Sequence, residues 1–107
     1  MAVDPNRIAW ETCALEKITE MVSRRVFEDR EAGATIVQTE LRKGALVARH
    51  THAGEQWIQV LQGAVAVSLD GAVISLEAGE SMTVPAGAPH QLEALEDSVV
   101  VDVRGTG

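Results

Sequence analysis

Turn-forming residues recur along the chain at intervals of roughly ten residues from Gly33 onward, and this spacing is typical of short antiparallel strands. The segments between the turns are rich in β-branched residues or alternate between apolar and polar residues, and each has room for a strand of about five residues. The turns are Ala32-Gly33, Lys43-Gly44, Ala53-Gly54, Gln62-Gly63, Asp70-Gly71, Ala78-Gly79 and Pro85-Ala86-Gly87. The chain is therefore expected to be all-β.

The segment Leu69-Asp70-Gly71-Ala72 places an Asp-Gly pair between two such strands, which predicts a hairpin with a two-residue type I′ turn. No stretch after Gly33 keeps a helical apolar period, and only residues 8–22 have room for a helical turn or two. An all-β chain of many short strands usually protects its edges by forming a barrel or a two-sheet jelly roll. With 107 residues, we expect residues 1–107 to form one domain.

The charge and the cysteine content exclude several classes of function. The chain carries 9 Lys and Arg against 16 Asp and Glu, a formal net charge of −7, so its surface repels nucleic-acid phosphates and anionic membranes. We expect neither nucleic acid nor a membrane as a partner. A single cysteine, Cys13, cannot form an internal disulfide, and no leader-like segment is evident. These features favour a cytoplasmic protein.

The three histidines of the chain are the candidate chemical residues. His50 and His52 lie two residues apart, a spacing that puts both side chains on one face of a strand, and Gln56 keeps the same parity. His90 follows a Pro-Ala-Gly-Ala-Pro turn on another strand. Four neutral nitrogen and oxygen donors that converge inside a barrel would form a site for a divalent transition metal with open positions for a ligand.

The spacing of these residues resembles the two motifs of the cupin superfamily. The two segments are Gly44-x5-His50-x-His52-x3-Gln56-x6-Gly63, within residues 44–63, and Gly79-x5-Pro85-x-Gly87-x2-His90, within residues 79–94. The resemblance implies a double-stranded β-helix, or jelly-roll barrel, with one metal ion held by His50, His52, Gln56 and His90. Cupins usually carry Glu at the position of Gln56 and Asn at that of Ala94. Glu55 is therefore an alternative fourth ligand, although strand parity favours Gln56.

An uncharged set of donors leaves the full charge of a divalent ion available to anionic oxygen atoms, so we expect carboxylates, enolates or hydroxy-acids as ligands. The sequence leaves Mn, Ni, Zn and Fe open as the metal. Arg25, Arg42 and Arg49 are candidates for binding a substrate carboxylate, and the sequence does not choose among them.

Two further segments resemble the small pectin-degradation cupins, which convert the ring form of unsaturated uronates to the linear keto form. They are His50-Thr51-His52-Ala53-Gly54-Glu55-Gln56-Trp57 and Leu95-Glu96-Asp97-Ser98-Val99-Val100-Val101-Asp102-Val103. The resemblance implies that Asp102 lies near the metal and moves protons between carbon and oxygen. It also shows a departure, because Arg104 stands where that family has an aromatic residue.

Three functions follow as hypotheses. The first is a metal-dependent enzyme that isomerises or tautomerises a small sugar-acid-like molecule. The second is a dioxygenase or lyase of the three-histidine cupin type, and the third is a non-catalytic module that binds or senses a small molecule. The N-terminal segment 1–30 is apolar at intervals and is expected to extend the sheet or to cover the sheet of a second copy, which predicts a homodimer.

Overall fold

The computed structural model describes residues 8–29 and 31–105. Over these residues the chain forms ten strands and one short 3-10 helix. The elements are η1 (Trp10–Thr12), β1 (Glu16–Lys17), β2 (Val22–Asp29), β3 (Ala34–Leu41), β4 (Leu46–His50), β5 (Gln56–Gln62), β6 (Ala64–Leu69), β7 (Ala72–Glu77), β8 (Ser81–Val84), β9 (His90–Ala94) and β10 (Ser98–Gly105). The all-β prediction is confirmed.

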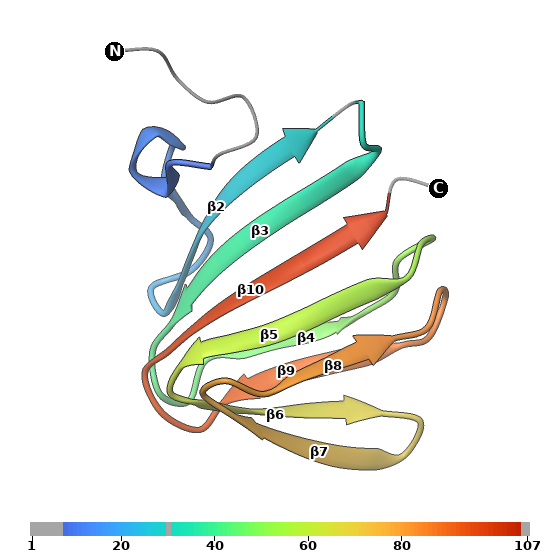
Figure 1. The fold of residues 1–107 in the computed structure, drawn as a ribbon. Helices are drawn as coiled ribbons and strands as arrows, with labels where there is room; N and C mark the ends of the chain where they lie inside the picture. The colour runs from blue at the N-terminus through green and yellow to red at the C-terminus, as the bar shows by residue number, and fades with distance from the viewer. Residues whose placement is uncertain (1–7, 30, 106–107) are drawn as a thin grey trace.

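The strands form two antiparallel sheets that face each other (Figure 1). The larger sheet has the order β1-β2-β3-β10-β5-β8, and the smaller has the order β4-β9-β6-β7. The C-terminal strand β10 lies between β3 and β5, so it pairs with strands from both halves of the chain. Consecutive strands β4 and β5 belong to different sheets. This is a double-stranded jelly roll, as predicted.

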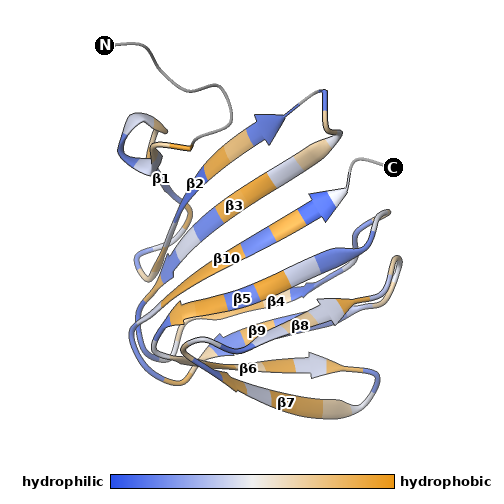
Figure 2. Ribbon diagram, in the orientation of Figure 1, coloured by the Kyte–Doolittle hydropathy of each residue, from blue (hydrophilic) through white to orange (hydrophobic). Residues whose placement is uncertain are grey.

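Alternation of apolar and polar residues places one face of each sheet in the interior (Figure 2). The most deeply buried side chains are valines from both sheets, Val60, Val65, Val67 and Val84. No aromatic residue belongs to the buried core of the described residues, so small β-branched side chains fill most of the space between the sheets. These short side chains leave room for the cavity described below.

The predicted hairpin is confirmed between β6 and β7. Leu69 pairs with Ala72, and both turn residues have positive φ, 51° at Asp70 and 76° at Gly71. These are the left-handed conformations of a type I′ turn, which Asp and Gly adopt at low cost. In the described part of the chain no helix is long and apolar enough to cross a membrane.

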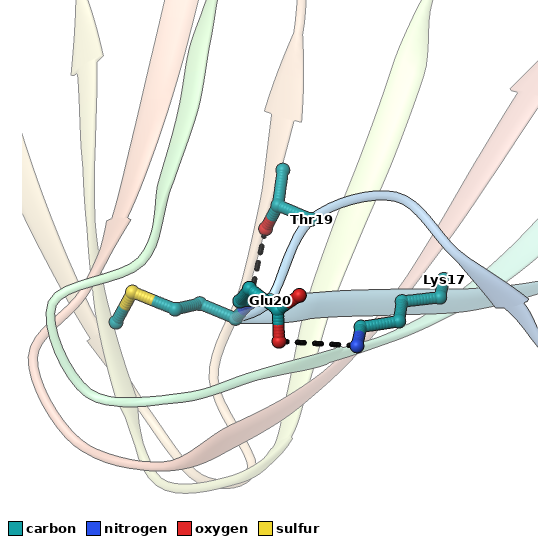
Figure 3. Close-up of polar contacts among 4 residues, drawn as sticks. Lys17, Thr19 and Glu20 are labelled. Atoms are coloured by element: carbon teal, nitrogen blue, oxygen red, sulfur yellow. Dashed lines mark hydrogen bonds and ion pairs between the residues drawn. The ribbon is translucent and has the colours of Figure 1, made fainter.

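The β1–β2 hairpin lies at one edge of the larger sheet, and its turn is held by several polar contacts (Figure 3). The backbone N–H groups of Ile18 and Thr19 both donate to the carbonyl oxygen of Val22, at 2.8 and 3.1 Å. The Thr19 hydroxyl accepts a hydrogen bond from the Met21 N–H at 3.1 Å, and Lys17 pairs with Glu20 at 3.1 Å. These contacts fix Ile18 and Thr19 on the rim of the cavity described below.

Candidate metal centre

A cavity of about 340 Å³ lies between the two sheets. Most of its wall is apolar, with side chains such as Val37, Ile58 and Leu92. The polar part of the wall is made mainly by Arg24, Thr39, His50, Gln56, His90, Asp102 and Arg104, which come from strands of both sheets. Polar groups that converge in an otherwise apolar pocket are typical of a small-molecule site.

The three histidines lie close to one another, and two of them, His50 and His90, line this cavity. One potential ligand atom from each of His50, His52 and His90 falls within 4.8 Å of the others, and the ring centroids are 4.3 to 5.3 Å apart. His50 is the last residue of β4 and pairs across the sheet with His90, the first residue of β9. His52 follows in the loop after β4, so this loop, and not strand alternation, brings it to the group.

Hydrogen bonds to the backbone fix the orientation of two of the rings. The Nδ1 atoms of His50 and His90 lie 2.8 and 2.9 Å from the carbonyl oxygens of Ala48 and Ala88. A carbonyl oxygen only accepts, so Nδ1 carries the proton in both rings. In the neutral rings the Nε2 atoms therefore keep their lone pairs, which is the form that binds metals.

Gln56 reaches the same cavity from the opposite sheet as the first residue of β5, and its side chain is buried. Its Nε2 atom donates a hydrogen bond to Asp102 Oδ2 at 3.1 Å. Since the carboxylate only accepts, this bond sets the amide orientation and leaves Gln56 Oε1 as an acceptor. The alternative ligand Glu55 is exposed.

Three buried atoms of the candidate metal ligands have no hydrogen-bond partner among the described residues: His52 Nε2, His90 Nε2 and Gln56 Oε1. Buried polar atoms are almost always satisfied, so orphaned atoms in one place indicate a missing ligand. Bonds of about 2.1 Å from nitrogen to a divalent ion bring two ligand nitrogens to within about 4 Å of each other. The ligand atoms of the three histidines lie within 4.8 Å of one another, slightly farther apart than this. The group otherwise suits an ion, and it supports a divalent metal site.

Burial lowers the pKa of His52 from its ordinary value of 6.5 to about 4, and the positive charge of Arg104 and the neighbouring His50 and His90 act in the same direction. Removal of water from a cation disfavours the protonated ring. His52 is therefore neutral at pH 7, the state in which an imidazole can bind a metal.

Asp102 lies on β10 and is buried, with 6% of its surface exposed. Its Oδ2 atom accepts hydrogen bonds from Gln56 and from Arg104 Nε, the latter at 2.7 Å. Both bonds use the Oδ2 atom, so neither residue engages Oδ1. The structure thus places a carboxylate inside the cavity and joins it, through Gln56, to the histidine region.

The three arginines considered from the sequence do not line this cavity. Arg42 and Arg49 are exposed, and Arg25 binds the backbone carbonyls of Trp10 and Cys13 at 3.2 and 2.6 Å. Arg24 and Arg104 line it instead. Arg24 could have been found from its position two residues from the apolar Val22 and Val26, which puts it on the inward face of the strand. Arg104 could have been found in the same way, because it lies two residues from Asp102 and so shares its face of the strand.

Trp57 lies on the outer face of the larger sheet, where 45% of its surface is exposed. It pairs with Val103 on one side and with Thr83 on the other. It does not line the cavity, so it is not positioned to stack on a ligand there. This agrees with its parity along β5, where it follows the inward-facing Gln56.

The fold and the histidine group define a cupin. Residues 37–103 match the Cupin domain family, and the chain belongs to that family. It is similar to the solved structure of KdgF from Halomonas sp., with 26% identity and a TM-score of 0.80 over 88% of this chain and 86% of that one. None of the curated proteins compared with the chain by sequence matches it.

Two further solved structures share the fold. An RmlC-like cupin from Shewanella frigidimarina has a TM-score of 0.84 and 24% identity over 97% of this chain and 93% of that one. A variant of oxalate decarboxylase from Bacillus subtilis has a TM-score of 0.82 and 19% identity, covering 92% of this chain but 28% of that one. These similarities show the jelly-roll fold alone. The chemistry of the site has to be inferred from the residues of this chain.

Proposed function

We propose that the protein is a metal-dependent enzyme that isomerises or tautomerises a small sugar-acid-like molecule of the unsaturated uronate type. The observation that carries the proposal is Asp102, a buried carboxylate bonded to Gln56 and Arg104 that lines the same cavity as His50 and His90. The resemblance of the segments around His50 and Asp102 to pectin-degradation cupins supports the same substrate class.

In this proposal His50, His52, His90 and Gln56 hold one divalent ion, with Mn, Ni or Zn expected for Lewis-acid chemistry. The bound ion would act as a Lewis acid that polarises oxygen atoms of the substrate. The backbone carbonyls of Ala48 and Ala88 aim two of the ring nitrogens. The hydrogen bond to Asp102 aims the Gln56 oxygen.

Asp102 is the candidate proton carrier. Conversion of a cyclic unsaturated uronate to the linear keto form removes the proton of the anomeric hydroxyl and breaks the bond between the anomeric carbon and the ring oxygen, which gives an aldehyde and an enolate. The enolate then takes up a proton on carbon, so the conversion needs a group that can accept and return a proton. The hydrogen bonds from Arg104 and Gln56 hold one carboxylate oxygen of Asp102 in place and leave the other available for this exchange. Apolar neighbours such as Ile58 and Val100 limit the access of water.

The first test is metal content, measured by mass spectrometry on untagged protein beside His90→Ala. About one ion per chain, absent from the variant, is expected. The loaded protein is then incubated with a cyclic unsaturated uronate, and formation of the keto form is followed by proton NMR. Metal binding without conversion would refute the enzymatic proposal and favour a binding or sensor module. Iron as the retained metal would favour the dioxygenase alternative.

We further propose that the protein acts as a cytoplasmic homodimer. The outer face of the larger sheet carries a row of four apolar residues, Phe27, Ile36, Val103 and Trp57, which are cross-strand neighbours on β2, β3, β10 and β5. Contiguous apolar rows on an outer face are typical of interfaces. Leu15 and Ile18 in the N-terminal region are also about half exposed.

A further inference from the structure

The described charged residues that line the cavity, apart from the histidines, are Arg24, Asp102 and Arg104. Asp102 and Arg104 form a close ion pair at 2.7 Å, so their charges compensate each other. Arg24 is left as an additional positive charge at the wall of the cavity, in a chain whose net charge is −7. The interior of the site thus has the opposite sign to the molecule as a whole.

Arg24 is incompletely satisfied by the protein. Its Nε atom is buried and has no hydrogen-bond partner among the residues that the structure describes. Its only ion pair there is with Glu16 on β1, at 3.7 Å, and both side chains are about half exposed. A long, solvated pair of this kind contributes little to stability, so a ligand anion can displace Glu16 at low cost.

The neighbours of Arg24 complete a small polar region. Thr39 faces Arg24 across the β2–β3 pair and lines the same cavity. Its hydroxyl can donate to an anion beside the arginine. Ile18 and Thr19, in the β1–β2 turn, line the same cavity. The guanidinium and the hydroxyl are the groups that bind a carboxylate by charge-assisted hydrogen bonds.

The strand register separates this region from Asp102. Val26 and Val37 lie in the same row as Asp102, and Arg24 lies two residues further along β2 and two strands away. Strand spacings of about 4.8 Å and residue spacings of about 3.4 Å put the Arg24 and Asp102 Cα atoms roughly 12 Å apart. Both side chains line the cavity, so a ligand with a few carbon atoms between its polar groups can bridge the distance between them.

We propose that Arg24, assisted by Thr39, binds a carboxylate group of the substrate at the end of the cavity away from the histidines. The ligand is then an elongated acid, with oxygen atoms at the histidine end and an anionic group on Arg24. This inference rests on the proposed function and adds to it the residue that selects an acid over the corresponding neutral sugar or ester.

The test uses protein loaded with Mn²⁺ and titrated by calorimetry with succinate, glutarate and adipate, each beside its monomethyl ester. The acid and its ester have similar length and differ by one charge. The native protein is expected to bind the best-fitting diacid about tenfold or more tighter than its ester. Arg24→Gln is expected to reduce this ratio to about one. Arg24→Lys keeps the charge but not the planar pair of donors, and an intermediate ratio is expected.

Arg42→Gln is the matched control, because it removes the same charge from an exposed residue outside this cavity. It is expected to keep the native ratio. A native ratio in both Arg24 variants, with folding verified by thermal unfolding, would overturn the proposal. If Arg24→Gln does not fold, Arg24→Lys still supplies the comparison.

The titrations are repeated on metal-free protein, so that the metal site and the Arg24 site are judged separately. A failure of all proteins to bind Mn²⁺ would count against the proposed function alone. Weaker binding of the diacids to metal-free Arg24→Gln than to the metal-free native protein would still support the Arg24 site. The Arg24 proposal would be overturned if Arg24→Gln and the native protein bound the diacids with equal affinity, both with and without Mn²⁺.

Discussion

Gln56 donates a hydrogen bond from Nε2 to Asp102 Oδ2 at 3.1 Å, and both side chains are buried. The bond joins a candidate metal ligand to the candidate proton carrier. An amide at position 56 favours this contact, because two ionised carboxylates at this distance would repel each other. The departure from the usual cupin Glu is therefore matched to the presence of Asp102.

Gln56→Glu is expected to destabilise the metal-free protein by about 1–3 kcal/mol at pH 7, because it puts a second carboxyl group beside Asp102. A divalent cation would offset this repulsion. Adding Mn²⁺ should therefore raise the melting temperature more in the variant than in the native protein. Gln62→Glu, the same change at an exposed residue of β5, is the control. An equal Mn²⁺ effect in both variants would show that residue 56 does not contact the ion.

Asp102→Asn is expected to lower the rate of uronate conversion by about 10²- to 10⁴-fold, the usual loss when a positioned acid–base group is removed. The metal content should be unchanged, since Asp102 is not among the proposed ligands. Asp70→Asn, in the exposed β6–β7 turn, makes the same chemical change and should be fully active. Retention of activity in Asp102→Asn would remove Asp102 from the mechanism.

The His52 ring of metal-free protein is expected to stay neutral down to about pH 4, which a proton NMR titration, assigned with His52→Gln, can measure. The unfolded chain takes up a proton on this residue near its ordinary pKa of 6.5. Above pH 6.5 His52 is neutral in both the folded and the unfolded state, so it carries no protonation penalty there. Because its pKa is lower in the folded state, the free energy of unfolding falls as the pH drops from 6.5 to about 4. The slope should be smaller in His52→Gln. A His52 midpoint near 6.5 would contradict the prediction.

Gly63→Ala is expected to be strongly destabilising. Gly63 has φ of 82°, and an added Cβ would collide with the backbone oxygen of Asp97 and the hydroxyl of Ser98. Gly79→Ala is the control, because φ there is 90° but an added Cβ meets nothing within 4 Å. Each variant should lose about 1–3 kcal/mol from backbone strain, and only Gly63→Ala should lose more. Equal losses in denaturant titrations would refute the role of the close contact.

The homodimer predicts a solution mass of twice the 11.4 kDa chain in size-exclusion chromatography with light scattering. Trp57→Lys puts a charge in the outer apolar row and is expected to give monomers, since a buried unpaired charge is costly. Val73→Lys, at a residue of β7 with 69% exposure, should remain dimeric. A native mass equal to that of one chain would refute the dimer.

The sequence was sufficient to predict the strands and the Asp70-Gly71 turn because alternation and turn chemistry are local. It was harder to predict that Arg24 and Arg104 line the cavity. The set of side chains that share a cavity depends on which strands become neighbours, and this is not a local property of the sequence. His52 shows the same limit. Strand alternation predicted that the His52 side chain points to the same side as that of His50. In the structure β4 ends at His50, so His52 lies in the loop and alternation does not apply to it. Gln56 reaches the site from the other sheet, and only the three-dimensional arrangement shows this crossing.

The rings of His50 and His90 are each anchored on the carbonyl oxygen of an alanine two residues earlier in the same segment. The hydrogen bonds that orient these rings are therefore made by the main chain and do not depend on the identity of a neighbouring side chain. An engineer could replace Arg24, Thr39 or Val100 to admit a different molecule while the imidazoles keep their orientation. In this proposal, the residues that would hold the ion are therefore separate from the residues that would select the ligand.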